Sequence, residues 1–235
     1  MCSVSHSKKA IFIHIPKCAG IYVRSNLEKF YDFETFLCKR TDHKEYCSTD
    51  MILNKNVQLT FCNSVGIIKY YKTSKELSGM LNLDDEKWND YYKFTFVRNP
   101  YSRIVSAWNY IMETNGYNID FDVYLSYKNI MSENEYSHVI LPMTSHIFDE
   151  NNKLYINHIA KFENLEDEFR KILLHIGFSE NEIIHDPSPK NKREHGDYKK
   201  YYTQEILNIV NELYKDDFEI LNYKKCNTIE ELHEL

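Results

Sequence analysis

The stretch Ala10-Ile-Phe-Ile-His-Ile-Pro-Lys-Cys-Ala-Gly20 contains the change of pattern that indicates the fold. Its first six residues are apolar apart from one histidine, and they predict a short strand over residues 10–15. Pro16 ends this strand, and residues 19–30 then predict a helix. A strand that passes into a helix through so short a turn is the unit from which α/β proteins are built.

The same alternation of strands and helices continues along the chain. Further strands are predicted over residues 57–62, 92–97 and 155–162. Helices are predicted over residues 121–127 and over 164–175, where Gly177 closes the second of them. Three more helices are predicted from their starts, which are the pair Asn99-Pro100, the capping box of Ser179 and Glu182, and Thr203. This order predicts an α/β protein with a P-loop-like three-layer fold, in which a central parallel sheet of four or five strands is flanked by helices. With no linker that would divide it, the chain is expected to form a single domain, 1–235.

The charge and hydropathy of the chain argue against two classes of partner. The formal net charge is −6, whereas general nucleic-acid binding needs a basic face. No apolar run reaches the roughly 18 residues of a membrane span, and the polar N-terminus does not read as a signal peptide, so we expect a cytoplasmic protein or one whose membrane anchor lies outside this sequence. One short stretch is basic and taken alone indicates a solvated loop; its residues are Lys190, Lys192, Arg193, Lys199 and Lys200.

The six cysteines lie too far apart for a knuckle of metal ligands. Cys38 and Cys47 could form a disulfide across a loop, or they could contribute to a zinc site together with His43. In a reducing compartment free thiols are the expected state, and no metal is expected.

The first motif with chemical meaning is His14-Ile-Pro-Lys-Cys-Ala-Gly20, at the junction of the first strand and helix. A helix N-terminus presents N–H groups and a positive dipole end, which suit a phosphate or sulfate, and Lys17 adds a charge. The motif is not a Walker A loop, because it lacks the glycine spacing and the hydroxyl that follows the lysine. By spacing alone, an ordinary turn with an exposed lysine explains it equally well.

The second motif runs from Tyr92 to Trp108 and reads YKFTFVRNPYSRIVSAW. Arg98 ends a strand, and Ser106 lies two turns into the helix that follows. A guanidinium and a hydroxyl held on rigid elements could bind a second phosphate. The alternative is that Arg98 and Arg103 pair with surface carboxylates.

In this order and spacing, the two motifs resemble the PAPS-dependent sulfotransferases. The similarity is greatest to the carbohydrate (heparan/chondroitin-type) branch, with its H-[IV]-P-K-x-[AG]-G-T-S and [FL]-x-R-[DN]-P-x-x-R-x-x-S patterns. Segments 138–142 and 159–165 resemble the branch's H-x-x-P-Q and G-R-F-E-N-L elements, and 214–223 resembles its Y-x-x-D-F-x-x-F-G-Y. The resemblance therefore extends from about residue 10 to residue 223.

The resemblance implies a donor site for PAPS, with PAP as the product. The loop residues that would bind the 5′-phosphosulfate are Lys17, Cys18, Ala19, Gly20, Ile21 and Tyr22. Arg98 and Ser106 would hold the 3′-phosphate, and Lys17 would neutralise the bridging oxygen as the S–O bond breaks. The reaction would be an in-line transfer stabilised by electrostatics, with no metal.

This sequence departs from the family pattern at two places. Ile21 and Tyr22 stand where the pattern has Thr-Ser, which removes a hydroxyl contact and leaves the backbone N–H groups. Asn63 stands where relatives commonly have His or Glu, and an amide cannot accept a proton at neutral pH. His14, which lies nearest the loop in sequence, is therefore a candidate catalytic residue beside Lys17. The other candidate bases are His43 and His138.

The resemblance favours a carbohydrate hydroxyl as the acceptor. Two alternatives remain open: a sulfotransferase that acts on a small molecule, a lipid or a tyrosine, and a non-catalytic protein that binds PAP or PAPS with a decayed site. The departures at Ile21, Tyr22 and Asn63 motivate the second alternative.

Overall fold

The structure is a computed structural model that describes residues 2–29, 33–40, 51–54, 57–62, 78–79, 81, 83–115, 118–126, 141–149, 151–183 and 196–235. The chain folds into two compact units. The first consists of Met1–Val97 and Ile147–Lys192, and the second of Arg98–His146 and Arg193–Leu235. The first unit contains all the described strands, whereas the second is helical.

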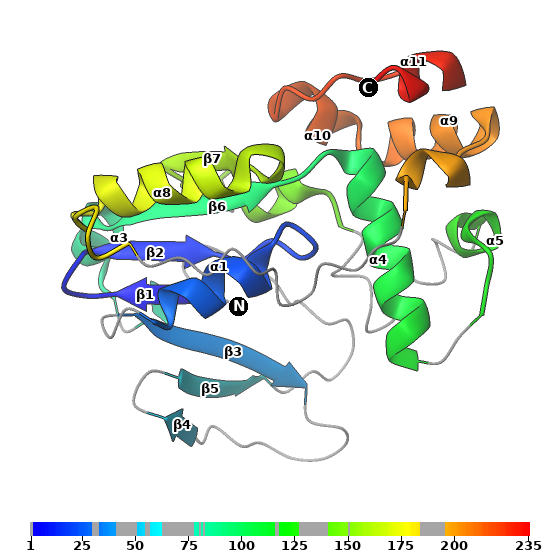
Figure 1. Ribbon diagram of the computed structural model, residues 1–235. Helices are drawn as coiled ribbons and strands as arrows, with labels where there is room; N and C mark the ends of the chain where they lie inside the picture. Colours follow the sequence, from blue (N-terminus) through cyan, green and yellow to red (C-terminus); the bar gives the residue numbers. More distant parts are fainter. Residues whose placement is uncertain are drawn as a thin grey trace. The chain divides into compact units, whose positions relative to one another are not determined.

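The described residues of the first unit form a seven-stranded sheet in the order β4-β5-β3-β1-β2-β6-β7 (Figure 1). In chain order the strands are β1 (Cys2–Ser5), β2 (Ala10–Ile13), β3 (Glu34–Arg40), β4 (Met51–Asn54), β5 (Val57–Cys62), β6 (Tyr92–Val97) and β7 (His158–Lys161). The pairs β2–β6, β6–β7 and β3–β5 are parallel, whereas β1–β2, β1–β3 and β4–β5 are antiparallel. The α/β class is therefore confirmed, but the sheet is mixed and larger than the parallel sheet of four or five strands that the sequence predicts.

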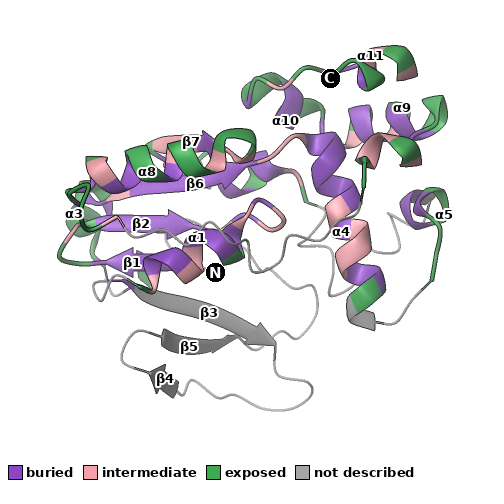
Figure 2. Ribbon diagram, in the orientation of Figure 1, coloured by how far each residue is buried: buried purple, intermediate pink, exposed green. Residues whose placement is uncertain are grey.

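β1 is a strand that the sequence pattern does not reveal. Its residues Cys2, Ser3, Val4 and Ser5 belong to a segment that reads only as a polar N-terminus, yet all four are buried (Figure 2). β1 is an inner strand, because it pairs with β2 on one edge and with β3 on the other. Two of its four residues are serines, so local propensity could not indicate a buried strand.

Several element boundaries differ from the predicted ones by a few residues. β5 and β6 have the predicted ends, whereas β2 stops at Ile13, and residues 14–15 already lead into the turn before α1 (Gly20–Leu27). β7 is shorter than the predicted strand over 155–162, because the chain first crosses to β6, where the N–H of Asn157 donates to the carbonyl oxygen of Lys93 (2.8 Å).

Aromatic side chains fill one face of the sheet. The rings of Phe12 on β2 and Phe94 on β6 lie 5.4 Å apart. On the same face, the ring of Phe169 in α8 (Leu165–His175) lies 6.4 Å from that of Phe96 and 6.1 Å from that of Tyr22 in α1. α1 and α8 therefore cover this face and bury it.

The end of α8 follows the predicted cap, and the capping box after it forms a turn over the described residues, which stop at Ile183. Gly177 has a φ of 91°, and the N–H of Phe178 donates to the carbonyl oxygen of Leu173 (3.0 Å), which is the Schellman arrangement. Beyond it, the carboxylate of Glu182 accepts hydrogen bonds from the N–H and the hydroxyl of Ser179 (2.7 and 2.6 Å).

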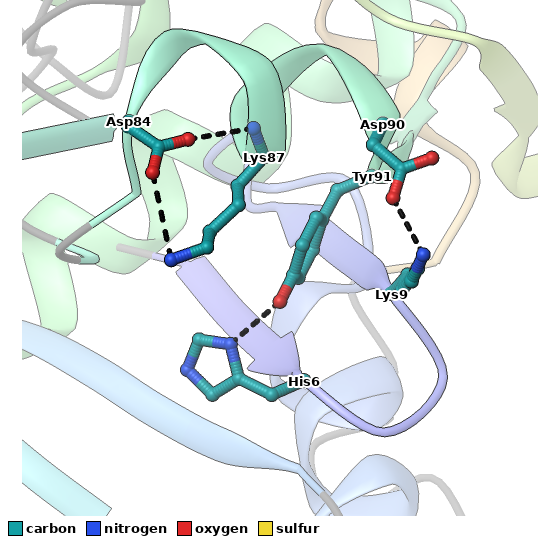
Figure 3. Close-up of polar contacts among 6 residues, drawn as sticks. All are labelled: His6, Lys9, Asp84, Lys87, Asp90 and Tyr91. Atoms are coloured by element: carbon teal, nitrogen blue, oxygen red, sulfur yellow. Dashed lines mark hydrogen bonds and ion pairs between the residues drawn. The ribbon is translucent and has the colours of Figure 1, made fainter.

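The turn between β1 and β2 fastens α3 (Asp85–Asp90) to the sheet (Figure 3). The Nδ1 atom of His6 lies 2.8 Å from the hydroxyl of Tyr91, and the ammonium of Lys9 donates to the carboxylate of Asp90 at 2.7 Å. Because Tyr91 lies between α3 and β6, these contacts fix the point at which the chain enters β6.

Lys93 is a buried cation at the start of β6 and is only 4% exposed. Its ammonium donates to the carbonyl oxygens of Trp88 and Tyr91, the latter at 2.7 Å, and lies 5.0 Å from the centre of the Trp88 ring. Burial lowers the pKa of Lys93 from 10.5 to about 8, and the charge of Asp90 opposes part of this change. Lys93 thus joins the end of α3 to the sheet.

The second unit is a group of short helices around α4. Its described elements are α4 (Pro100–Asn115), α5 (Phe121–Ser126), η1 (Met143–His146), η3 (Tyr198–Tyr201), α9 (Gln204–Leu213), α10 (Lys215–Ile220) and α11 (Ile229–His233). The predicted caps are confirmed: the side chain of Asn99 accepts from the N–H of Tyr101 (2.9 Å), and that of Thr203 accepts from the N–H of Ile206 (3.3 Å). Tyr101 then donates its hydroxyl proton to Asn211 (2.6 Å) inside the core.

We expect the free energy of unfolding of the wild type, relative to that of Lys93→Met, to rise with pH above about 8. Between about pH 8 and 10.5 the unfolded chain binds a proton at Lys93 that the folded chain has released, so raising the pH favours the folded state. The expected slope is at most about 1.4 kcal/mol per pH unit.

Urea unfolding followed by circular dichroism across this pH range measures the difference. Lys87→Met, at an exposed position of α3, is the matched control. A pH-independent difference for Lys93→Met would contradict the prediction.

Candidate functional site

The loop between β2 and α1 has the backbone conformation of an anion-binding turn. Lys17 and Ala19 have φ values of 66° and 63°, in the left-handed region that costs a residue with a side chain roughly 1–2 kcal/mol. Between them Cys18 is buried, and its N–H lies 3.4 Å from the carbonyl oxygen of Ile15, which it donates to. Turns with left-handed residues gather successive N–H groups into a concavity that binds anions.

α1 begins at Gly20 without a side-chain cap. The preceding residue is Ala19, and the first hydrogen bond of the helix runs from the N–H of Val23 to the carbonyl oxygen of Ala19 (3.1 Å). The N–H groups of Gly20 and Ile21 therefore lie in the first turn of α1, before the first hydrogen bond within the helix. With Lys17 half-buried just ahead of this turn, the helix start suits a phosphate or sulfate group.

Neither Ile21 nor Tyr22 supplies the short hydroxyl side chain of the Thr-Ser pattern at this loop. Ile21 is apolar and 44% exposed, whereas the ring of Tyr22 is buried against Phe169 of α8.

His14 lies between the strand and the first turn of the helix. Its half-buried ring is stacked with that of Phe12, at 6.1 Å between centroids and 15° between planes, and it lies against Gly20. His14 is thus packed directly against the loop that contains Lys17.

Arg98 follows β6 directly, and the start of α4 orients it. Its Nε donates to the hydroxyl of Ser102 (3.0 Å), and that hydroxyl donates in turn to the carbonyl oxygen of Asn99 (3.1 Å). Ser106 lies one turn further along α4 and is half-buried. Ser102 was not singled out from the sequence, although its spacing of four residues from Arg98 is a usable signal.

Arg103 is a core residue and not a surface cation. Its side chain is fully buried, and it donates to the carbonyl oxygen of Leu141 (2.9 Å). Nearby, the buried carboxylate of Asp217 accepts from the N–H groups of Met143 and Thr144 (2.9 Å each). Burial raises the pKa of Asp217, and the charge of Arg103 opposes this rise. Asp217 thus joins α10 to η1 inside the second unit.

The C-terminal motif belongs to the same core. Tyr214, Asp217 and Phe218 are all buried. Asn222, which follows α10, has a φ of 53°, and the N–H of Tyr223 donates to the carbonyl oxygen of Phe218 (3.0 Å). Asparagine stands here in place of the glycine of the pattern, and it is one of the few residue types that adopt this conformation readily.

Acidic residues are distributed unevenly over the helix starts. Among the α-helices of the described residues, α3, α5, α8, α9, α10 and α11 each have at least one acidic residue in the first turn. Only α1 and α4 have none. In a chain of net charge −6, the two helix starts that follow β2 and β6 are therefore the ones without a competing negative charge.

The register of the sheet places the ends of these two strands together. β2 and β6 are parallel neighbours, with Ile13 opposite Thr95, whose hydroxyl donates to the carbonyl oxygen of Ile13 (2.7 Å). The chain thus leaves both strands at the same edge of the sheet, which is the edge where ligands bind in α/β proteins.

Several predicted residues lie outside the described part of the chain. They are His43, Cys47, Asn63, His138, Lys190, Lys192 and Arg193, and of Cys38 only the backbone in β3 is described. Lys199 and Lys200 belong to η3: Lys199 donates to the carbonyl oxygen of His233 (2.9 Å), and Lys200 lies over the ring of Tyr201. Within the described residues no group of three or more His, Cys, Asp or Glu side chains could hold a metal ion. Among the described helices, none has the length and apolar character needed to cross a bilayer.

The neighbouring parallel strands β2 and β6 thus lead into helix starts without acidic residues, and this is an arrangement in which α/β proteins can bind an anion. The chain belongs to the sulfotransferase family, because the family's sequence model matches residues 2–224, which include most of both units. Neither curated proteins nor solved structures provided a match. Family membership makes this chain a transferase of sulfuryl groups.

We expect Asp217→Ala to lower the free energy of unfolding by about 3–5 kcal/mol, because two backbone N–H groups and the Thr144 hydroxyl would lose their buried acceptor and Arg103 would lose a favourable negative charge. Asp216→Ala, at the exposed neighbouring position, should change it by no more than about 0.5 kcal/mol. Urea denaturation of both variants gives the comparison, and equal losses would show that Asp217 has no such role.

Proposed function

We propose that this sulfotransferase takes its sulfuryl group from PAPS and transfers it to a carbohydrate hydroxyl. The observation that carries the proposal is the pair of acid-free helix starts after two neighbouring parallel strands, in a chain of the sulfotransferase family. PAPS has two separate anionic groups, the 5′-phosphosulfate and the 3′-phosphate, so two anion sites are what its recognition requires. The family match over both units supports a single sulfotransferase domain, 1–235.

The first anion site in the proposal is the loop from Lys17 to Tyr22. Its N–H groups bind the 5′-phosphosulfate, and Lys17 neutralises the charge that develops on the bridging oxygen. The acceptor oxygen attacks sulfur as the bond between sulfur and the bridging oxygen breaks, PAP leaves with that electron pair, and the acceptor proton passes to a base. These steps need positioned charge and no metal.

The second anion site is the start of α4. There Arg98, oriented by Ser102, and Ser106 hold the 3′-phosphate. A guanidinium is planar and carries its N–H donors in a fixed fork, which is the geometry that suits a phosphate.

The carbohydrate acceptor rests on the likeness of the HIPK and RNPYSR motifs to the carbohydrate branch. A specific observation also favours a second candidate, a non-catalytic protein that binds PAP. Ile21 is apolar and the Tyr22 ring is buried, so the loop lacks the Thr-Ser hydroxyls of the family pattern. An acceptor panel of sugars, phenols and tyrosine peptides incubated with PAPS separates these functions, and it also covers the small-molecule acceptors.

We expect Arg98→Ala to weaken PAP binding by about 1.5–3 kcal/mol, the value of a hydrogen bond to a charged group. Calorimetric titration with PAP measures the loss, and ADP, which lacks the 3′-phosphate, should bind poorly to the wild type. Arg170→Ala, at an exposed position of α8, is the control. Unchanged PAP affinity in Arg98→Ala would place the 3′-phosphate elsewhere.

Lys17→Ala should abolish transfer from PAPS while the protein stays folded, because the leaving group would lose its counter-charge. Release of PAP during turnover with the best acceptor of the panel is the measurement. Lys225→Ala, at an exposed position, should retain wild-type turnover. Near-normal turnover in Lys17→Ala would refute the role of this lysine.

A further inference from the structure

The imidazole of His14 occupies the space that a side chain at Gly20 would need. A Cβ atom built on Gly20 would lie 2.0 Å from both Cδ2 and Nε2 of His14 and 2.6 Å from its Cε1. No residue with a Cβ fits there unless the ring moves. Gly20 has no positive φ that would require glycine, so the ring of His14 is the reason for glycine at this position.

The sheet supports the other side of the same ring. Phe12, two residues earlier on β2, is 1% exposed and stacks with His14 at 15° between the ring planes. Phe12 is itself packed against Phe94 of the neighbouring strand, at 5.4 Å between centroids. The imidazole is thus held between a rigid aromatic face and the first residue of α1.

The backbone between His14 and Gly20 is the part of the chain that must stay in an unfavourable conformation. Lys17 and Ala19 both have left-handed φ values, and such residues persist only where the surrounding structure holds them. Burial holds this segment at Ile15 and Cys18, which are each 1% exposed, and the segment ends at Gly20. A contact that fixes Gly20 therefore fixes the end of the strained segment.

We propose that His14 is a positioning residue of the donor loop: its ring, seated on Gly20, holds the first turn of α1 and the backbone N–H groups of residues 19–21 in their anion-binding arrangement. The inference rests on the proposed function, since it assigns the loop to the donor. It explains why the loop needs glycine at its last position, and it gives the histidine a role that depends on the shape of its ring and not on its proton.

A double-mutant cycle at His14 and Gly20 tests the contact. Gly20→Ala should weaken PAP binding at least about tenfold and lower the melting temperature, because the new methyl group displaces the ring. His14→Ala/Gly20→Ala should bind PAP more tightly than Gly20→Ala alone, since the clash is removed. Gly79→Ala is the matched control, because nothing lies within 4 Å of a Cβ at that exposed glycine. Equal losses from Gly20→Ala in the presence and absence of the His14 ring would overturn the proposal.

The conservative variant His14→Phe separates a role in positioning from a role in proton transfer. A phenyl ring keeps the planar contact with Gly20, so His14→Phe should retain PAP affinity, transfer and the wild-type pH profile, whereas His14→Ala should raise the KM for PAPS and leave the KM for the acceptor unchanged. Loss of transfer in His14→Phe with intact PAP binding would identify His14 as the base and overturn the proposal.

The melting temperatures of the same variants measure the contact without any nucleotide. Failure of the wild type to bind PAP would count against the proposed function, and with it against the donor role of His14. Additive melting temperatures in the cycle would instead count against the contact between His14 and Gly20, whatever the wild type binds.

Discussion

The parallel pairing of β2 with β6 is the interaction on which the arrangement of the candidate site depends. Ile13 stands opposite Thr95 at the ends of these strands, and the Thr95 hydroxyl reinforces the pairing by donating to the carbonyl oxygen of Ile13. Because parallel strands run in the same direction, both chains leave the sheet at one edge. The ends of β2 and β6 therefore lie at the same edge of the sheet, although more than 80 residues separate Ile13 from Val97 in the sequence.

The helices that follow β2 and β6 also differ from the other described α-helices in the charge of their first turns. This acidic chain places carboxylates in the first turn of the other described α-helices, where they complement the helix dipole, but not in α1 or α4. The loop before α1 also keeps Lys17 and Ala19 in the left-handed region. Both features lower stability locally and are expected where a bound anion supplies the missing negative charge.

Buried polar groups, and not only apolar packing, define the second unit. Asp217 accepts hydrogen bonds from the backbone of η1, and the hydroxyl of Tyr101 accepts from the N–H of Cys226 while it donates to Asn211. Each of these contacts joins segments more than 70 residues apart in the chain. Such groups are satisfied only in one arrangement of the helices, so they select that arrangement.

The sequence by itself determined the α/β class, the ends of β5 and β6, the helix caps at Asn99 and Thr203, and the two motifs that carry the candidate site. These features depend on local period, on cap chemistry or on residue order, all of which can be read along the chain. The tertiary structure alone decided that the serine-rich segment Cys2–Ser5 is a buried strand, that Arg103 is a core residue, and that the His14 ring explains Gly20. Each of these outcomes depends on a pairing partner elsewhere in the chain or on the direction in which a side chain points. Neither of these two properties produces a pattern in the local sequence.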